Sequence, residues 1–118
     1  MNWIQLDSEE TINEVKAKSR EGRVFIFLFS GKVVTGIIVR NLLEREWTDG
    51  EMNMDTYFLD VNEKPDAAAA ASKEFGVEVH SHQGLIIEKG KCLFSAIEGK
   101  VRFDVLREYS NPKRKKKV

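Results

Sequence analysis

The sequence contains a single cysteine, Cys92, among its 118 residues. One thiol excludes an internal disulfide and any zinc site built from several cysteines. It also excludes thiol–disulfide exchange completed within one chain, because that cycle needs two cysteines. No apolar run approaches the roughly 20 residues that a membrane-spanning helix requires. The first residues show neither the basic start nor the apolar centre of a signal peptide, so we expect a cytoplasmic protein.

An excess of charge of one sign is also missing, since 19 basic residues balance 19 acidic ones. Five of the basic residues stand together near the C-terminus: Lys113, Arg114, Lys115, Lys116 and Lys117. The rest of the chain therefore has 14 basic residues against 19 acidic ones. We expect one domain over residues 1–110 and a flexible, solvated basic tail over residues 111–118. The alternative for the tail is weak contact with nucleic acid or an anionic membrane surface. The rest of the chain shows no basic face with interleaved aromatic residues, which argues against nucleic-acid binding as the main function.

The most hydrophobic stretch, residues 24–29 (VFIFLF), predicts a strand buried on both faces of a sheet. The turn signal Ser30-Gly31 ends it. Residues 36–47 then show a helical pattern, in which Ile38, Leu42 and Trp47 would face the sheet and Arg40 would point outward. In α/β folds, functional residues gather where a strand ends and feeds a helix.

The remaining patterns predict a complete small α/β domain. Residues 3–6 form either an edge strand or a lid on the core, and residues 7–10 suggest a helix start. Further along, the patterns predict a strand at 56–61, a helix from Pro65 to Phe75, strands at 84–88 and 92–96, and a closing helix over 101–109. The right-handed crossover rule leaves few arrangements of these elements. The simplest is a central four-stranded mixed sheet with helices on both faces, as in the thioredoxin-like fold.

Several segments of the sequence resemble thioredoxin-like proteins. They are residues 57–65 (YFLDVNEKP), the Ala-rich helix after them, residues 73–77 (KEFGV) and the hairpin 84–91 (GLIIEKGK). Residues 76–83 (GVEVHSHQ) are similar to a Gly-Val-x-x-x-Ser-x-Gln stretch of the monothiol bacilliredoxin family. That family's members are short and lack a Cys-x-x-Cys pair. The resemblance covers roughly residues 3–109. It implies a thioredoxin-like fold and removal of low-molecular-weight thiols from proteins.

Two positions depart from the pattern that this resemblance implies. The family carries a cysteine in the loop after the first central strand, and aligning its motif on Ser30 places Val33 at that position, within one residue. Thioredoxin-like proteins also place a cis-proline before the hairpin, where this chain has His82. Since a non-proline cis bond costs about 2.5–4 kcal/mol, we expect the Ser81–His82 bond to be trans.

Loss of the thiol and of its neighbouring proline favours a binding module over a redox enzyme. The expected contact surface, for a protein partner or for self-association, is the rim of the former active site: Phe29, Ser30, Gly31, Lys32, Val33, Val34, Ser81 and His82. The alternative is a monothiol redox protein in cell redox homeostasis that works through Cys92 or with another thiol. We interpret Cys92 as a structural residue on an apolar strand.

Other site chemistries find little support in the sequence. His80 and His82 could bind a metal, but a zinc site needs three or four protein ligands and no third is evident, so we expect no metal and no cofactor. The N-terminus of the second predicted helix, near Thr35, could hold an anion through its backbone N–H groups. Ser30, His82 and Asp60 could meet at the end of the sheet, although α/β folds bring some polar residues there in any case.

Overall fold

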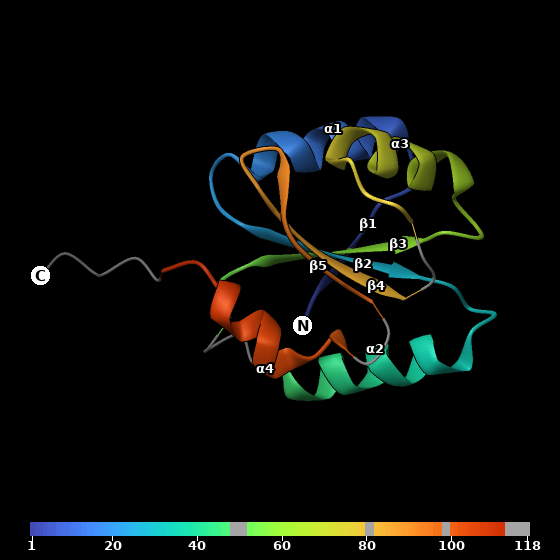
Figure 1. Cartoon of the computed structure of the whole chain (residues 1–118), viewed down its shortest axis with the longest axis vertical. Coiled ribbons are helices and arrows are strands. Elements are labelled where there is room, and N and C mark those ends of the chain that lie inside the picture. The colour runs from blue at the N-terminus through green and yellow to red at the C-terminus, as the bar shows by residue number, and fades with distance from the viewer. Residues whose placement is uncertain (48–51, 80–81, 98–99, 113–118) are drawn as a thin grey trace, which may run out of the picture.

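The computed structural model describes residues 1–47, 52–79, 82–97 and 100–112. One five-stranded sheet lies between two layers of helices (Figure 1). In chain order the elements are β1 (Trp3–Gln5), α1 (Glu9–Lys18), β2 (Val24–Phe29), α2 (Val34–Glu46), β3 (Asp55–Asp60), α3 (Pro65–Phe75), β4 (Gln83–Glu88), β5 (Lys91–Ile97), α4 (Phe103–Leu106) and the short 3₁₀ helix η2 (Arg107–Tyr109). In the described part of the chain, no helix is both long and apolar enough to cross a membrane.

The strand order is β1-β3-β2-β4-β5, with β1, β3 and β2 parallel and with β4 and β5 antiparallel to their inner neighbours. The predicted class, a mixed sheet covered on both faces, agrees with this arrangement. The sheet has one strand more than the four predicted, because Trp3–Gln5 pairs with β3 and places Trp3 opposite Thr56. The N-terminal segment is thus an edge strand rather than a lid. Three residues are too few to show a strand pattern in the sequence.

The central strand β2 is buried along its whole length, as its apolar run predicts. Its side chains alternate between the two faces of the sheet. Phe25 and Phe27 belong to the core beneath α2 and α4, whereas Ile26 and Leu28 belong to the core beneath α1 and α3. Figure 1 shows α1 and α3 on one side of the sheet and α2 and α4 on the other.

Local signals set the ends of two of the helices. Ser8 caps α1 in a capping box whose second partner is Thr11: the Thr11 N–H donates to the Ser8 hydroxyl, and the Ser8 N–H donates to the Thr11 hydroxyl. Pro65 occupies the first turn of α3, and Gly76 ends that helix with a left-handed φ of 64°. A glycine adopts this conformation without steric cost.

The predicted orientation of α2 is right for Trp47 and wrong for Ile38 and Leu42. Gly36, Leu43 and Trp47 face the sheet, whereas Ile38 and Leu42 are 52% and 44% exposed. The helix carries apolar residues on both faces, so hydrophobic periodicity does not distinguish the buried face from the exposed one.

The sequence predicted that Arg40 would point outward into solvent. Its guanidinium instead lies over the aromatic rings of the core. Its guanidinium carbon lies 4.6 Å from the ring centroid of Phe58 and 5.6 Å from that of Phe29. A guanidinium at this distance from an aromatic ring is attracted by the ring's negative face. Arg40 therefore lies over the edge of the aromatic core, while its side chain stays 37% exposed and pairs with Glu44 at 2.9 Å.

Candidate binding site

The rim begins with a turn that Ser30 organises at the C-terminal end of β2. The Ser30 hydroxyl accepts hydrogen bonds from the Lys32 backbone N–H, at 3.3 Å, and from the Asn62 side-chain amide. The Ser30 carbonyl accepts from the Val33 N–H at 3.1 Å. Ser30 itself is buried, so its function is to shape the loop rather than to offer a hydroxyl to a ligand. No pattern in the sequence indicates this contribution of Asn62.

Two other predicted rim residues also lie beneath the surface. Phe29 is buried against Phe58, with ring centroids 5.0 Å apart. His82 is only 7% exposed. Ser81, the remaining residue that precedes the hairpin, lies outside the described residues, as does its bond to His82. Phe29, Ser30 and His82 are thus the buried part of the rim, beneath its exposed residues.

His82 packs against the first turn of α2. A Cβ added at Gly36 would lie 3.1 Å from the His82 Cβ, so the close approach depends on the glycine at that position. His82 has a φ of 45°, a left-handed conformation that costs energy in a residue with a side chain. Its Nδ1 atom is buried and has no hydrogen-bond partner among the described residues. A glycine in the first turn of a helix is a signal of close packing that the sequence analysis did not use.

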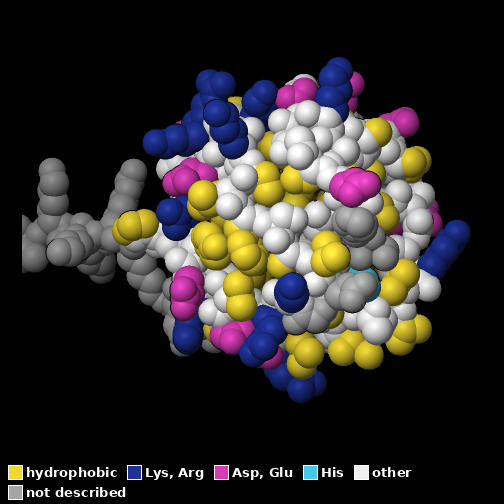
Figure 2. All heavy atoms as spheres, in the orientation of Figure 1, with side chains coloured by type: hydrophobic (Ala, Val, Ile, Leu, Met, Phe, Trp, Pro, Cys, Tyr) yellow, Lys and Arg dark blue, Asp and Glu magenta, His cyan; other side chains and the backbone are white. Residues whose placement is uncertain are grey.

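The accessible part of the rim is its loop, together with the side of α2 that follows it. Gly31 and Lys32 are exposed, Val33 is half-buried, and Val34 is 70% exposed. Four exposed apolar side chains then follow one side of the helix, and we call them the apolar face of α2: Val34, Ile37, Ile38 and Leu42. Figure 2 shows hydrophobic side chains along the lower border of the molecule, where Figure 1 places α2. The rim therefore opens onto an exposed apolar surface.

The start of α2 has few groups to neutralise its N–H dipoles. No acidic residue lies in the first turn, and the N-cap residue Val33 has no hydroxyl or carboxylate with which to accept a hydrogen bond. The first N–H groups of a helix have no partner within the helix. This end of α2 therefore carries an uncompensated positive dipole beside the exposed Lys32. An anion near Thr35 stays a prediction.

Cys92 lies far from the rim. It pairs with Ile87 on β4, and Ile87 pairs with Val24, the first residue of β2. Phe29 is five positions further along β2, which at about 3.4 Å per residue separates Cys92 from the rim by roughly 17 Å. Cys92 is half-buried, and its Sγ donates a hydrogen bond to the Phe94 carbonyl at 3.3 Å. Burial raises the pKa of its thiol, while a hydrogen bond from the Phe94 backbone to the sulfur lowers it by a smaller amount.

The other predicted chemistries gain no support from the geometry of the described residues. Asp60 accepts hydrogen bonds from the backbone N–H groups of Asn62 and Glu63, so its carboxylate shapes a turn. It is not bonded to Ser30 or His82 within the described part of the chain. Among all the residues that the structure describes, no three or more metal-ligating side chains lie together. His80 and the basic run 113–117 lie outside the described residues.

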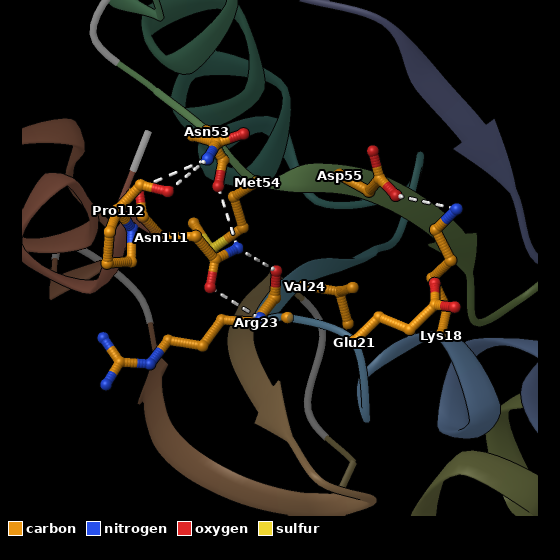
Figure 3. Close-up of a pocket in the computed structure, with 10 residues that line it drawn as sticks. Lys18, Glu21, Arg23, Val24, Asn53, Met54, Asp55, Asn111 and Pro112 are labelled. Carbon is orange, nitrogen blue, oxygen red and sulfur yellow. Dashed lines mark hydrogen bonds and ion pairs between the residues drawn. The ribbon is translucent and has the colours of Figure 1, made fainter. Parts of the chain in front are cut away.

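A cleft lies at the end of the sheet opposite the rim, where β2 and β3 begin. It is an open cleft of about 440 Å³ (Figure 3). Lys18 and Asp55 form an ion pair across part of it at 3.8 Å, and both side chains are about half exposed. An exposed pair of this kind adds little stability. The Asn53 and Asn111 side chains in the cleft donate hydrogen bonds to backbone carbonyls of the protein.

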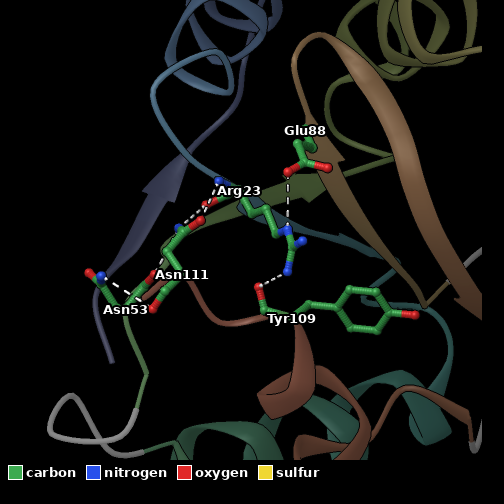
Figure 4. Close-up of polar contacts among 5 residues, drawn as sticks. All are labelled: Arg23, Asn53, Glu88, Tyr109 and Asn111. Atoms are coloured by element: carbon green, nitrogen blue, oxygen red, sulfur yellow. Dashed lines mark hydrogen bonds and ion pairs between the residues drawn. The ribbon is translucent and has the colours of Figure 1, made fainter. Parts of the chain in front are cut away.

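The C-terminal segment is attached at this same end by a set of contacts that we call the C-terminal clip: Arg23, Asn53, Ser110 and Asn111. Figure 4 shows three of these residues, Arg23, Asn53 and Asn111. The Asn111 amide accepts from the Arg23 N–H and donates to the Arg23 carbonyl, both at 2.9 Å, and donates to the Asn53 carbonyl at 2.8 Å. The Arg23 guanidinium binds the Glu88 carboxylate and the Tyr109 carbonyl, each at 3.3 Å. Asn111, which the sequence assigned to the tail, thus contacts the start of β2.

Comparison with protein families gives one match across almost the whole chain. The family model described as monothiol bacilliredoxin BrxC matches residues 4–106. That span includes the rim, α2 and both strands of the hairpin. Comparison with curated proteins finds no match.

Solved structures share the fold. One is described as a candidate oxidoreductase with a thioredoxin fold: it is 19% identical, the alignment covers 90% of this chain and 91% of that one, and the TM-score is 0.76. Thioredoxin of Fasciola hepatica is 14% identical over 88% of this chain and 92% of its own, with a TM-score of 0.68. Thioredoxin of Schistosoma mansoni is 11% identical over 92% and 93%, with a TM-score of 0.67. The chain therefore has a thioredoxin fold.

Proposed function

The chain belongs to the monothiol bacilliredoxin family, and from that premise we propose that its rim is a noncovalent binding surface for a protein. In this proposal the thioredoxin fold is retained and thiol chemistry at the family's usual place is not. No other side-chain type can replace a thiolate in disulfide exchange. Residues 29–36 contain no cysteine, and Cys92 lies at the other end of the sheet.

The observation that carries the proposal is the exposed apolar surface that begins where the family's cysteine is expected. Val34 is 70% exposed directly after Val33, and three further apolar residues of α2 continue the surface. Apolar side chains gathered around a loop are typical of protein contact sites. The loop beneath them is held by Ser30, so the surface is preformed.

Photocrosslinking in the cells that make the protein tests this proposal. A benzophenone amino acid at Val34 should give discrete crosslinked products after irradiation. The matched control places it at Leu93 on β5, an apolar residue that is 45% exposed but lies outside the rim. We expect products from position 34 and none, or different ones, from position 93. Equal product patterns at the two positions, or none at position 34, would contradict the proposal.

The second candidate function is monothiol redox chemistry through Cys92, which family membership favours. In that reaction the Cys92 thiolate would attack the sulfur of a small thiol bound to a protein cysteine. The mixed disulfide would move onto Cys92, and the protein cysteine would leave as a thiolate. The raised pKa of the Cys92 thiol and its partial burial both disfavour the first step. We therefore place this function second.

We also propose the cytoplasm as the compartment. A chain with one half-buried thiol gains no stability from an oxidising environment.

A further inference from the structure

We propose that the apolar face of α2 binds the same face of a second copy of this chain, with the two helices antiparallel about a twofold axis at Ile38. This inference rests on the proposed function, because it names the partner that occupies part of the rim surface. It depends on three features of α2, which are the spacing of its exposed apolar residues, the charge at its two ends and its length.

The spacing is symmetric about Ile38. Val34, Ile38 and Leu42 are four residues apart, so they form one ridge along the helix. Helices commonly pack by interdigitating ridges of this kind. In an antiparallel pair centred on Ile38, Val34 of each copy lies level with Leu42 of the other. The surface is then complementary to itself, which a twofold interface requires.

The charges at the two ends of α2 also favour the antiparallel arrangement. The first turn has no acidic residue and follows the exposed Lys32. The last turn carries the negative end of the helix dipole and, with Glu44, Arg45 and Glu46, a net charge of −1, although Glu44 is ion-paired with Arg40 one turn earlier at 2.9 Å. Antiparallel pairing places the positive end of each helix beside the negative end of the other. A parallel pair would bring like ends together.

The length of the helix limits the strength of the dimer. α2 has 13 residues and is therefore about 20 Å long. Stable interfaces bury about 800 Å² on each partner, which is more than one face of such a helix provides. We therefore expect a reversible dimer that forms at micromolar or higher concentration, rather than a permanent one.

Sedimentation equilibrium on the full chain, from about 10 μM to 1 mM, measures this association. The native protein should pass from monomer to dimer within that range. Ile38→Glu places two carboxylates together at the axis and should raise the dissociation constant at least about tenfold. Leu93→Glu makes the same change at a similarly exposed position on β5 and should leave the constant unchanged. A native monomer at every concentration would overturn the inference.

Cysteine crosslinking tests the arrangement, with Cys92→Ser as the background so that only the introduced thiol can react. A disulfide needs Cα atoms within about 7 Å, so Ile38→Cys should crosslink to itself on mild oxidation. Leu42→Cys should not, because the two copies of that residue would be about 12 Å apart along the axis. It should crosslink to Val34→Cys when the two variants are mixed. Self-crosslinking of Leu42→Cys as strong as that of Ile38→Cys would overturn the arrangement.

The two sets of experiments separate this inference from the proposed function. If the chain stays monomeric while position 34 crosslinks to other proteins, self-association is wrong and the binding surface stands. If position 34 yields no product and the chain is monomeric, both are wrong.

Discussion

The two ends of the sheet differ in how their polar groups are used. At the start of β2 and β3, the C-terminal clip joins backbone and side-chain groups of Arg23, Asn53 and Asn111 in a dense network. At the opposite end, α2 begins without a capping side chain, and the buried Nδ1 of His82 has no partner among the described residues. The surface above that end is apolar and exposed.

This contrast supports the proposal that the rim end serves contact, while the clip end contributes stability. Buried polar groups in stable regions are almost always hydrogen-bonded, so an unpaired one usually marks strain or function. Residues held in unfavourable φ/ψ regions cluster at binding sites for the same reason. His82 combines both features beside the rim. The clip end shows neither feature at the residues that form it.

The largest effect on stability should come from Asn111→Ala at the clip. The change removes three hydrogen bonds, two of them to the half-buried backbone of Arg23. At about 1 kcal/mol for each bond, the free energy of unfolding should fall by about 2–3 kcal/mol in urea titrations. Asn41→Ala, on the exposed side of α2, is the control and should change it by less than about 0.5 kcal/mol. Equal losses in the two variants would contradict the contrast between the ends.

Restoring a thiol to the rim should show that its environment still favours a thiolate. In a Cys92→Ser background, Val33→Cys places the sulfur at the uncapped N-terminus of α2, where the helix dipole lowers a thiol pKa. Iodoacetamide at neutral pH should label this cysteine at least about tenfold faster than Cys92 in the native protein, because the pKa of Cys92 is raised by burial. Slower labelling at position 33 would mean that the rim no longer has the electrostatics of a thiol site.

Substituting Gly36 tests the contact with His82. Alanine favours a helix over glycine by up to about 1 kcal/mol, but here its Cβ would lie 3.1 Å from the His82 Cβ. We expect Gly36→Ala to lower the free energy of unfolding in the native background and to raise it by up to about 1 kcal/mol in a His82→Gly background, because only glycine removes the Cβ that Ala at position 36 would meet. A double-mutant cycle measures this coupling. Additive effects would mean that the two residues do not constrain each other.

The smallest effect concerns the pH dependence of stability. The pKa of Cys92 is raised in the folded state, chiefly by burial, so above the ordinary thiol pKa the unfolded chain ionises while the folded chain stays neutral. The contribution is fully present below the unfolded pKa and is lost as pH rises toward the folded one. The free energy of unfolding should therefore decline as pH rises above about 9, and Cys92→Ser should reduce that decline.

Tyr57 adds a similar loss at higher pH. Its pKa is raised by burial first, and then by the negative charges of Asp55 and Glu14. Tyr57→Phe in the Cys92→Ser background should remove the part of the decline that begins near about pH 10. A decline unchanged in the double variant would mean that other groups cause it.

The sequence was sufficient for the central elements of the fold because their signals are strong. The continuous apolar run of β2 predicted both its position and its burial, and Pro65 and Gly76 marked the ends of α3. The three residues of β1 were too short to distinguish an edge strand from a lid, because β1 depends on pairing with a distant strand.

The candidate site was predictable only in part. The loop after β2 was found because the topology of α/β folds places sites there. The burial of Ser30 and His82 was not predictable, because segments distant in the sequence pack over them. Two residues of the apolar face of α2, Ile38 and Leu42, were assigned to the core because they are apolar, whereas Val34 was assigned to the rim. Only the structure shows that Leu43 lies on that side instead, beside Trp47, which was predicted there, and that the Arg40 guanidinium lies over the Phe58 ring. The contact of Gly36 with His82 joins residues 46 positions apart, and no local pattern indicates it.

The measurement that tests the central claim most directly is a reductase assay on a protein that carries a low-molecular-weight thiol as a mixed disulfide. It compares the native chain with Cys92→Ser and with Val33→Cys in the Cys92→Ser background. We expect no release of the small thiol by the first two proteins, and formation of a mixed disulfide on the introduced rim thiol in the third. Release by the native chain that disappears with Cys92→Ser would contradict the account, because the family's chemistry would then have moved to β5.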